Sequence, residues 1–187
     1  LNYEDTKFSK SNHIGVFGSD VIESGIHSDL WRFYLLAVRP ERQDTAFSWE
    51  DFFTNINNIF LNNIGNLVNR TLVYCQKNFD GKLEEPIFEE SHIEFMKEVQ
   101  ELQAEITDAM DKVSIKEALR LILQVGSLGN IFFDRQKPWV KIKEDRESVA
   151  TTISILIHLI RDIAVMLEPF MPETSVRILK MLNLEDQ

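Results

Sequence analysis

The stretch of sequence that decides the fold is residues 144–168, EDRESVATTISILIHLIRDIAVMLE. Residues 153–167 are strongly apolar, with interruptions at His158, Arg161 and Asp162. A helix drawn through the stretch is apolar on most of its faces, so other helices must cover it. A membrane-spanning helix needs about 20 predominantly apolar residues, and this apolar part is shorter. The stretch therefore predicts the central, buried helix of a helical bundle.

Helical patterns also occupy the chain before this stretch. Residues 48–51, SWED, resemble a capping box, and Asp80-Gly81 is a typical helix end. Between them, apolar residues recur at helical spacing: Phe52, Ile56, Ile59, Phe60, Leu67 and Leu72. These signals predict one helix of about thirty residues, roughly 45 Å long. Two further candidate capping boxes, Ser91-x-x-Glu94 and Ser114-x-x-Glu117, predict two more helices.

Two glycines, Gly126 and Gly129, lie inside the helix predicted to begin after Ser114. A glycine inside a helix costs about 1 kcal/mol of stability relative to alanine. We expect these two positions to permit close packing against another helix.

The first part of the chain has a different character from the rest. Residues 1–27 carry most of the loop signals, and one short helix is predicted from Leu30 to Val38. The candidate cap of that helix is Ser28 or Asp29, and Pro40 lies beyond its end. We therefore expect a mainly α-helical protein, with a small mixed segment at residues 1–47 and a helical-bundle domain at residues 48–187.

The charge of the chain restricts the nucleic-acid contacts that it can make. Its formal net charge is −10. Sequence-independent binding to phosphates requires a basic surface, which this charge does not favour. Any RNA contact is therefore expected to be local and specific, or to be helped by other parts of the protein.

Cysteine and histidine usage gives no sign of a metal site. Cys75 is the one cysteine, which excludes an internal disulfide and a cysteine-cluster zinc site within this chain. The four histidines are scattered and lack metal-ligand spacing. This usage is typical of a reducing, cytosolic environment. The chain starts at Leu1 without a signal-peptide pattern, so we expect a piece of a longer cytoplasmic protein.

The sharpest local feature is residues 7–11, KFSKS. Lys7 and Lys10 are separated by small hydroxyl residues, which suits polyphosphate binding. The ammonium groups neutralise charge, while Ser9, Ser11 and the backbone amides donate hydrogen bonds. Such a loop can stabilise the charge that develops on a departing pyrophosphate. The five residues alone fit a solvated chain end equally well.

Three other residues are candidates for recognising a base. Asn66 and Arg70 are four residues apart, so they share a helix face and can reach one ligand together. An amide and a guanidinium can read a base edge through paired hydrogen bonds. Trp139 follows Pro138 at a helix break, where an exposed ring can stack on a base. The alternatives are an ordinary surface pair and a tryptophan that fills the space between helix ends.

Several segments, taken in order along the chain, resemble one enzyme family. They are KFSKS at 7–11, GVFG at 15–18, DLWRFYLL at 29–36, RPE at 39–41, DTAFSW at 44–49, NIGNLVNR at 63–70, FDG at 79–81 and KPW at 137–139. The first resembles the KMSKS loop of class I aminoacyl-tRNA synthetases, with Phe8 in the Met position. The others resemble methionyl-tRNA synthetases, particularly the eukaryotic cytosolic type. The resemblance is weaker at residues 83–111 and after Glu173.

The resemblance implies roles for the loop. In this family the second lysine of the loop contacts ATP, which here is Lys10, and Lys7 is the accessory cation. The family usually has Arg-Gly directly after the loop, whereas this chain has Asn12-His13. The family's HIGH motif and methionine pocket do not occur in this chain. ATP, its Mg²⁺ and methionine are therefore expected to need a catalytic domain outside the chain, and the chain alone should be inactive and bind no cofactor.

The resemblance also implies a partner. The family's anticodon-reading residues fall on Asn66, Arg70 and Trp139, which implies recognition of the CAU anticodon of tRNA(Met). Two alternatives remain at this point. One is a related class I synthetase for isoleucine, valine or leucine. The other is a helical protein-interaction module without an RNA role, which the acidic charge favours mildly. No membrane partner is expected.

Overall fold

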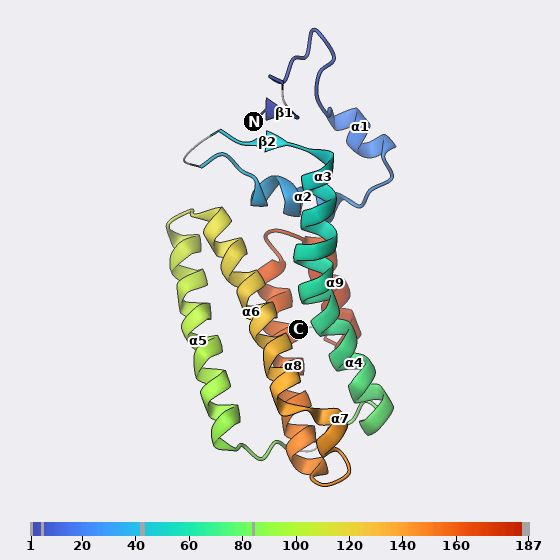
Figure 1. Ribbon diagram of the computed structural model, residues 1–187, viewed down its shortest axis with the longest axis vertical. Coiled ribbons are helices and arrows are strands. Elements are labelled where there is room, and N and C mark those ends of the chain that lie inside the picture. Colours follow the sequence, from blue (N-terminus) through green and yellow to red (C-terminus); the bar gives the residue numbers. More distant parts are fainter. Residues whose placement is uncertain (1, 5, 42–43, 84, 185–187) are drawn as a thin grey trace.

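The structure is a computed structural model that describes residues 2–4, 6–41, 44–83 and 85–184. It is elongated, with a small mixed segment at one end of a helical bundle (Figure 1). The mixed segment contains strands β1 (Asn2–Tyr3) and β2 (Ala46–Phe47), which pair in parallel, and helices α1 (Gly18–Glu23) and α2 (Ser28–Ala37). The bundle contains α3 (Trp49–Thr54), the π-helix η1 (Asn55–Gly65), α4 (Asn66–Phe79), α5 (Glu90–Asp111), α6 (Ile115–Gln136), α7 (Pro138–Lys141), α8 (Arg146–Leu167) and α9 (Pro172–Met181). The expected mainly α-helical fold is confirmed.

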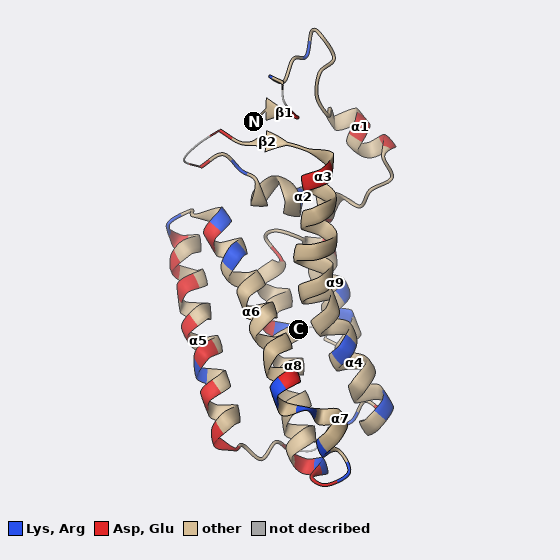
Figure 2. Ribbon diagram, in the orientation of Figure 1, with Lys and Arg blue, Asp and Glu red and all other residues tan. Residues whose placement is uncertain are grey.

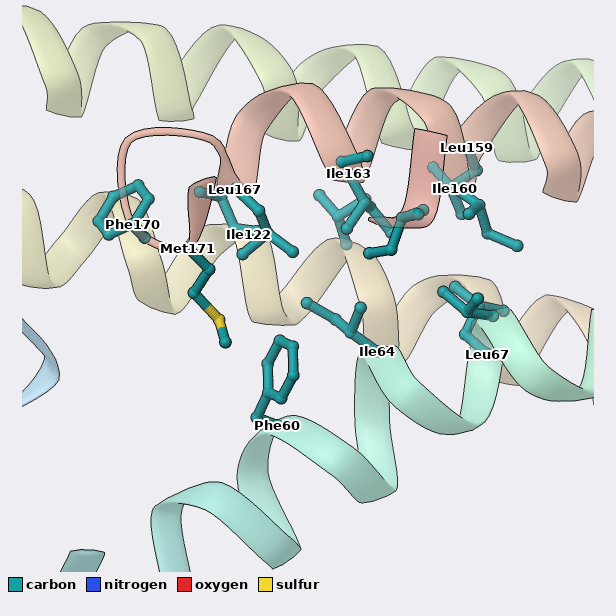
Figure 3. Close-up of a cluster of buried hydrophobic side chains, with 14 of the residues drawn as sticks. Phe60, Ile64, Leu67, Ile122, Leu159, Ile160, Ile163, Leu167, Phe170 and Met171 are labelled. Carbon is teal, nitrogen blue, oxygen red and sulfur yellow. The ribbon is translucent and has the colours of Figure 1, made fainter. Parts of the chain in front are cut away.

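Helix α8 is the central helix that its sequence predicts. Its residues Leu159, Ile160, Ile163 and Leu167 are buried against side chains from η1, α4 and α6 (Figure 3). By length and composition alone, α8 is long and apolar enough to cross a membrane, yet 61% of its most apolar window is buried inside the protein. The other helices thus supply the apolar surroundings that the helix requires.

The long helix predicted after Ser48 is present but changes its pitch. The Ser48 hydroxyl accepts a hydrogen bond from the Asp51 amide (3.2 Å), as a cap should, and Asp80 ends the helix with a left-handed conformation (φ 54°). Between α3 and α4, however, the chain forms the π-helix η1, whose i→i+5 bonds widen the turn. The wider turn changes the buried face, so Ile59 is 39% exposed and Ile64 is fully buried.

Both glycines of α6 lie at close helix contacts, as expected. A Cβ atom at Gly126 would lie 2.7 Å from Asn63 Oδ1 and 2.9 Å from Ile64 Cγ1. A Cβ atom at Gly129 would lie 2.7 Å from side-chain atoms of both Leu67 and Leu159. The absence of side chains at these positions therefore sets how closely α6 approaches η1, α4 and α8.

Two predicted helix caps were wrong. Helix α2 is capped by His27, whose Nδ1 accepts from the Asp29 amide (3.3 Å), not by Ser28 or Asp29. Helix α5 is capped at Glu89, whose amide donates to Nδ1 of the buried His92 (3.1 Å). The reason in both cases is that an imidazole nitrogen accepts the hydrogen bond that a hydroxyl or carboxylate usually accepts.

An aromatic cluster connects the mixed segment to the bundle. The ring of Phe47 packs against Trp31 and Tyr34 of α2 and against Trp49 and Phe52 of α3. Phe47 and Trp31 are both only 4% exposed. The mixed segment is therefore fixed to the start of the long helix by shared apolar burial.

Candidate functional site

Helix α4 lies beside α6 and the start of α7, and polar contacts at a regular spacing connect it to them. Asn66 contacts Asn130, Arg70 contacts Asp134, and Tyr74 contacts Pro138. Within each pair the residues are 64 positions apart, and successive pairs are four positions apart. Because side chains four residues apart lie on one face of a helix, the three contacts form a series along a single interface.

The first contact of the series is made by two amides. Asn66 Nδ2 donates to Asn130 Oδ1 at 3.0 Å. The Asn130 amide nitrogen donates in turn to the backbone carbonyls of Asn63 and Gly126, both at 3.0 Å. Asn66 is exposed, so its remaining amide oxygen is accessible to a ligand.

The second contact is an ion pair whose arginine also packs on an aromatic ring. An Arg70 terminal nitrogen lies 2.6 Å from Asp134 Oδ1, with the arginine side chain 24% exposed. The guanidinium carbon lies 4.0 Å from the ring centre of the buried Phe133. Phe133 and Asp134 therefore hold the arginine in one orientation, while its other N–H groups stay available as donors.

The third contact positions the segment that carries Trp139. The Tyr74 hydroxyl donates to the Pro138 carbonyl at 2.8 Å. Burial raises the pKa of this hydroxyl, so it stays a donor. The Trp139 ring is 51% exposed and stacks beside Phe133 at 6.1 Å, with 22° between the planes. Half of this large ring is thus accessible to a planar ligand.

A wide groove runs along this interface. It has a volume of about 720 Å³ and is lined by the outward faces of η1, α4 and α6. Asn66 and Arg70 are among the lining residues, and five of the eleven other lining side chains are amides: Asn58, Asn62, Asn63, Gln124 and Asn130. A groove with amide donors and acceptors offers directional hydrogen bonds with little net charge.

The structure therefore connects Arg70 and Trp139 through Phe133, and it places Asn66 one helical turn before Arg70, against Asn130. Sequence reasoning missed Asn130, Phe133 and Tyr74, because their contacts join residues that are distant in the chain. Asp134, near the end of α6, forms an ion pair with Arg70 on α4. The matching four-residue spacing of the two helices was the one signal in the sequence that could have suggested these pairs.

The loop at residues 7–11 lies at the opposite end of the molecule from α7 (Figure 1). Ser9 and Ile14 exchange two backbone hydrogen bonds of 2.9 Å, which close a narrow turn around Lys10 and Ser11. The Ser9 and Ser11 hydroxyls are 3.3 Å apart. The Phe8 ring packs against Gly15, where a Cβ atom would lie 2.3 Å from the ring. Both Lys7 and Lys10 are exposed, so their ammonium groups can meet an anion.

Comparison with known proteins identifies the family of the chain. Residues 1–72 match the family model described as tRNA synthetases class I (M), so the chain is part of a class I aminoacyl-tRNA synthetase. Residues 85–187, more than half of the chain, match the model of the anticodon binding domain of methionyl tRNA ligase. The chain belongs to the methionyl-tRNA synthetase family and contains its anticodon-binding domain.

Individual relatives come from bacteria and eukaryotes. The methionine–tRNA ligase of Borrelia garinii subsp. bavariensis is 43% identical over 95% of this chain and 24% of its own length. The cytoplasmic enzyme of Caenorhabditis elegans is 41% identical over 95% and 20%, and that of Homo sapiens is 39% identical over 98% and 21%. The chain thus spans about a quarter or less of the length of these relatives.

Solved structures give the same result. A Mycobacterium tuberculosis methionyl-tRNA synthetase bound by methionyl-adenylate superimposes with a TM-score of 0.85 at 26% identity, over 95% of this chain and 36% of that one. The alternative of a synthetase for isoleucine, valine or leucine is not supported, because the matching family models, relatives and structures named here are all methionyl enzymes.

Proposed function

We propose that this chain binds the anticodon loop of tRNA(Met), and that Asn66, Arg70 and Trp139 read the bases CAU. The observation that carries the proposal is the pair of contacts that orients Asn66 and Arg70 toward one groove, next to a half-exposed tryptophan. The match of residues 85–187 to an anticodon binding domain supports the same class of partner.

The hydrogen-bonding groups left to Asn66 and Arg70 suit one base of the anticodon. The Asn66 amide nitrogen is used by Asn130, which leaves an acceptor oxygen facing outward. One Arg70 nitrogen is used by Asp134, which leaves N–H donors. The Watson–Crick edge of cytosine presents an amino donor beside two acceptors, so it complements an acceptor beside donors. Uracil has an acceptor, O4, where cytosine has its amino donor, and an N–H donor at N3 where cytosine has an acceptor. Each well-paired contact of this kind contributes about 1–3 kcal/mol of discrimination.

Trp139 supplies affinity for an unstacked base. Stacking of a base on an aromatic side chain is worth about 1–3 kcal/mol. The parallel Phe133 ring holds the tryptophan from one side and limits its rotation. Stacking tolerates every base, so in this proposal Trp139 sets the affinity, and the Asn66 and Arg70 pair sets the choice of base.

A titration with RNA tests this proposal. The 187-residue chain is mixed with an anticodon stem-loop bearing CAU or another anticodon, and Trp fluorescence or calorimetry gives the Kd. We expect tighter binding of CAU and a loss of about tenfold or more with Trp139→Ala. Val140→Ala is the matched control, because Val140 is adjacent and 53% exposed. For Asn66→Ala the control is Asn69→Ala, an exposed asparagine on the same helix. Equal affinity for the two anticodons would refute the proposal.

In the whole enzyme, the proposed reaction is the ATP-dependent attachment of methionine to tRNA(Met). A carboxylate oxygen of methionine attacks the α-phosphorus of ATP, the bond to pyrophosphate breaks, and methionyl-adenylate forms before the methionyl group passes to tRNA. Lys10 would contact ATP, Lys7 would be the accessory cation, and Ser9 and Ser11 would donate hydrogen bonds to phosphate. Lys10 and Ser11 are exposed in the turn that Ser9 and Ile14 close, and the exposed Lys7 lies two residues before it. Cations there stabilise pyrophosphate as its charge develops.

Pre-steady-state kinetics of the full-length enzyme tests the role of the loop. Lys10→Ala should slow adenylate formation far more than it weakens methionine binding. Lys97→Ala, an exposed lysine on α5, is the control. An unchanged rate of adenylate formation would contradict the assignment.

The remaining parts of the proposal concern the metal, the location and the domains. Mg²⁺ would arrive with ATP, and we assign it no ligand here, since the described residues contain no cluster of three or more metal-ligand side chains. Methionine and ATP would bind mainly to a catalytic domain outside this chain. We place the protein in the cytoplasm, as the names of the worm and human relatives say of those enzymes. The loop segment would be residues 1–47, and the anticodon-binding domain residues 48–187.

A further inference from the structure

The orientation of the Asn66 amide is determined by a second asparagine. An isolated asparagine on a helix surface can present either its oxygen or its nitrogen to a ligand, because the two orientations have nearly the same shape. Which atom faces the groove decides whether the residue selects a base donor or a base acceptor. The question is therefore which part of the structure prevents this amide from turning over.

Two backbone carbonyls fix the orientation of Asn130, the partner of Asn66. The Asn130 side chain lies between the carbonyls of Asn63 and Gly126, at 3.0 Å from each. Carbonyl oxygens only accept hydrogen bonds, so the Asn130 group that faces them must be its NH₂. With two acceptors engaged, reversing this amide would replace two hydrogen bonds by two oxygen–oxygen contacts. Asn130 is half-buried, so water cannot readily compensate for that loss.

The fixed Asn130 amide in turn fixes the orientation of the Asn66 amide. Because the Asn130 NH₂ is held at the carbonyls, its oxygen must point to Asn66, and Asn66 must donate to it (3.0 Å). The Asn66 oxygen is then the atom left for the ligand. The Asn63 carbonyl belongs to the last turn of the π-helix η1, directly before α4. Asn130 therefore binds the backbone at the point where the helix changes its pitch.

We propose that Asn130 is a positioning residue that determines specificity: it fixes the Asn66 amide with its oxygen toward the RNA and thereby selects cytosine over uracil at the base that Asn66 reads. This inference rests on the proposed function. Asn130 touches no base itself in this proposal. Its effect is on the ratio of two affinities, which a merely structural role would not change.

Stem-loops bearing CAU and UAU test the proposal with the 187-residue chain. The measured quantity is the ratio of the Kd for UAU to the Kd for CAU. Asn130→Ala lets the Asn66 amide turn over, so the ratio should fall about tenfold, or about 1.4 kcal/mol. Asn130→Asp keeps an acceptor for the Asn66 NH₂ although it loses both donors to the carbonyls. It should be destabilised, yet keep the ratio within roughly twofold of the wild type.

Two further variants separate positioning from folding. Ser127→Ala is the matched structural control, because Ser127 lies one turn away on α6 and contacts Asn63 (3.1 Å) but not Asn66. It should leave the ratio unchanged. Asn66→Asp presents only acceptors whatever its orientation, so adding it to Asn130→Ala should restore the preference for CAU. Circular dichroism and the unfolding midpoint show whether each variant is folded.

Each outcome separates this inference from the proposed function. If the wild-type chain does not prefer CAU, the proposed function fails. If the wild type prefers CAU and Asn130→Ala keeps the full ratio, the positioning role is refuted while the proposed function stands. If Asn130→Ala and Asn130→Asp lose the ratio equally, Asn130 is only structural. If Asn130→Ala does not fold, a lost ratio in a folded Asn130→Asp variant refutes the proposal by itself.

Discussion

Replacing Gly129 with alanine should destabilise the protein, although alanine is the better helix former. The added Cβ would lie 2.7 Å from Leu67 Cδ2 on α4 and 2.7 Å from Leu159 Cδ2 on α8. Leu67 is fully buried and Leu159 is 3% exposed, so neither side chain has free space to move into. The methyl group would therefore be compressed between two helices.

The magnitude follows from two opposing contributions. Overpacking a well-packed core costs about 1–3 kcal/mol. The change from glycine to alanine inside a helix stabilises the folded protein by about 1 kcal/mol. The expected net loss is about 1 kcal/mol, which lowers the Tm of a protein of this size by about 2–4 °C. Leu67 is adjacent to Asn66, so displacing it should also weaken binding of the CAU stem-loop.

Chemical denaturation with and without RNA measures both effects. Gly65→Ala is the matched control, because Gly65 lies at the end of η1, before α4, and its added Cβ would meet only Leu61, at 3.5 Å, an ordinary contact. That variant should gain about 0.5–1 kcal/mol. If Gly129→Ala is as stable as Gly65→Ala, or more stable than the wild type, the account of close packing at Gly129 is wrong.

Three other predictions concern stability and the site. Burial lowers the pKa of His92 below its ordinary value of about 6.5, so the unfolded chain binds the proton more readily. The free energy of unfolding should therefore fall as the pH drops below about 6.5, and His92→Asn should remove this component of a pH titration. Tyr74→Phe removes the bond to Pro138 and should cost about 0.5–1.5 kcal/mol, with lower fluorescence anisotropy of Trp139; an unchanged anisotropy contradicts the anchoring role. Asp145→Ala removes the side-chain cap of α8 and should cost about 1 kcal/mol in denaturant titrations.

The sequence determines the elements of this fold more clearly than their details. The apolar residues 144–168 predict a buried helix, because nothing except other helices can cover so many apolar faces. The π-helix η1 was not predictable, because residues four apart, such as Phe52, Ile56 and Phe60, fit a stripe on either type of helix. The caps of α2 and α5 were missed because each uses a histidine nitrogen, of His27 or of His92, as the hydrogen-bond acceptor, and histidine is not one of the preferred capping residues.

The same distinction applies to the candidate site. Asn66 and Arg70 could be paired from the sequence, because their four-residue spacing places them on one helix face. Their orientation could not be predicted, because it depends on Asn130 and Asp134, 64 residues away. Sequence patterns describe which residues share an element. Which atom of an amide faces a ligand depends on tertiary hydrogen bonds.

The distribution of charge is compatible with the proposed RNA-binding site in a chain of net charge −10. Helix α5 carries seven acidic residues and one lysine, and the acidic positions are spread along the length of this helix, at the side of the bundle (Figure 2). The groove lies between η1, α4 and α6, and its arginines, Arg70 and Arg120, are paired with Asp134 and Glu117. Paired cations contribute little to nonspecific phosphate attraction. In the proposed function, binding at this groove would then depend on base stacking and directional hydrogen bonds, which distinguish one anticodon from another. The acidic surface disfavours every RNA that cannot make those contacts, so the net charge of the chain adds to its selectivity.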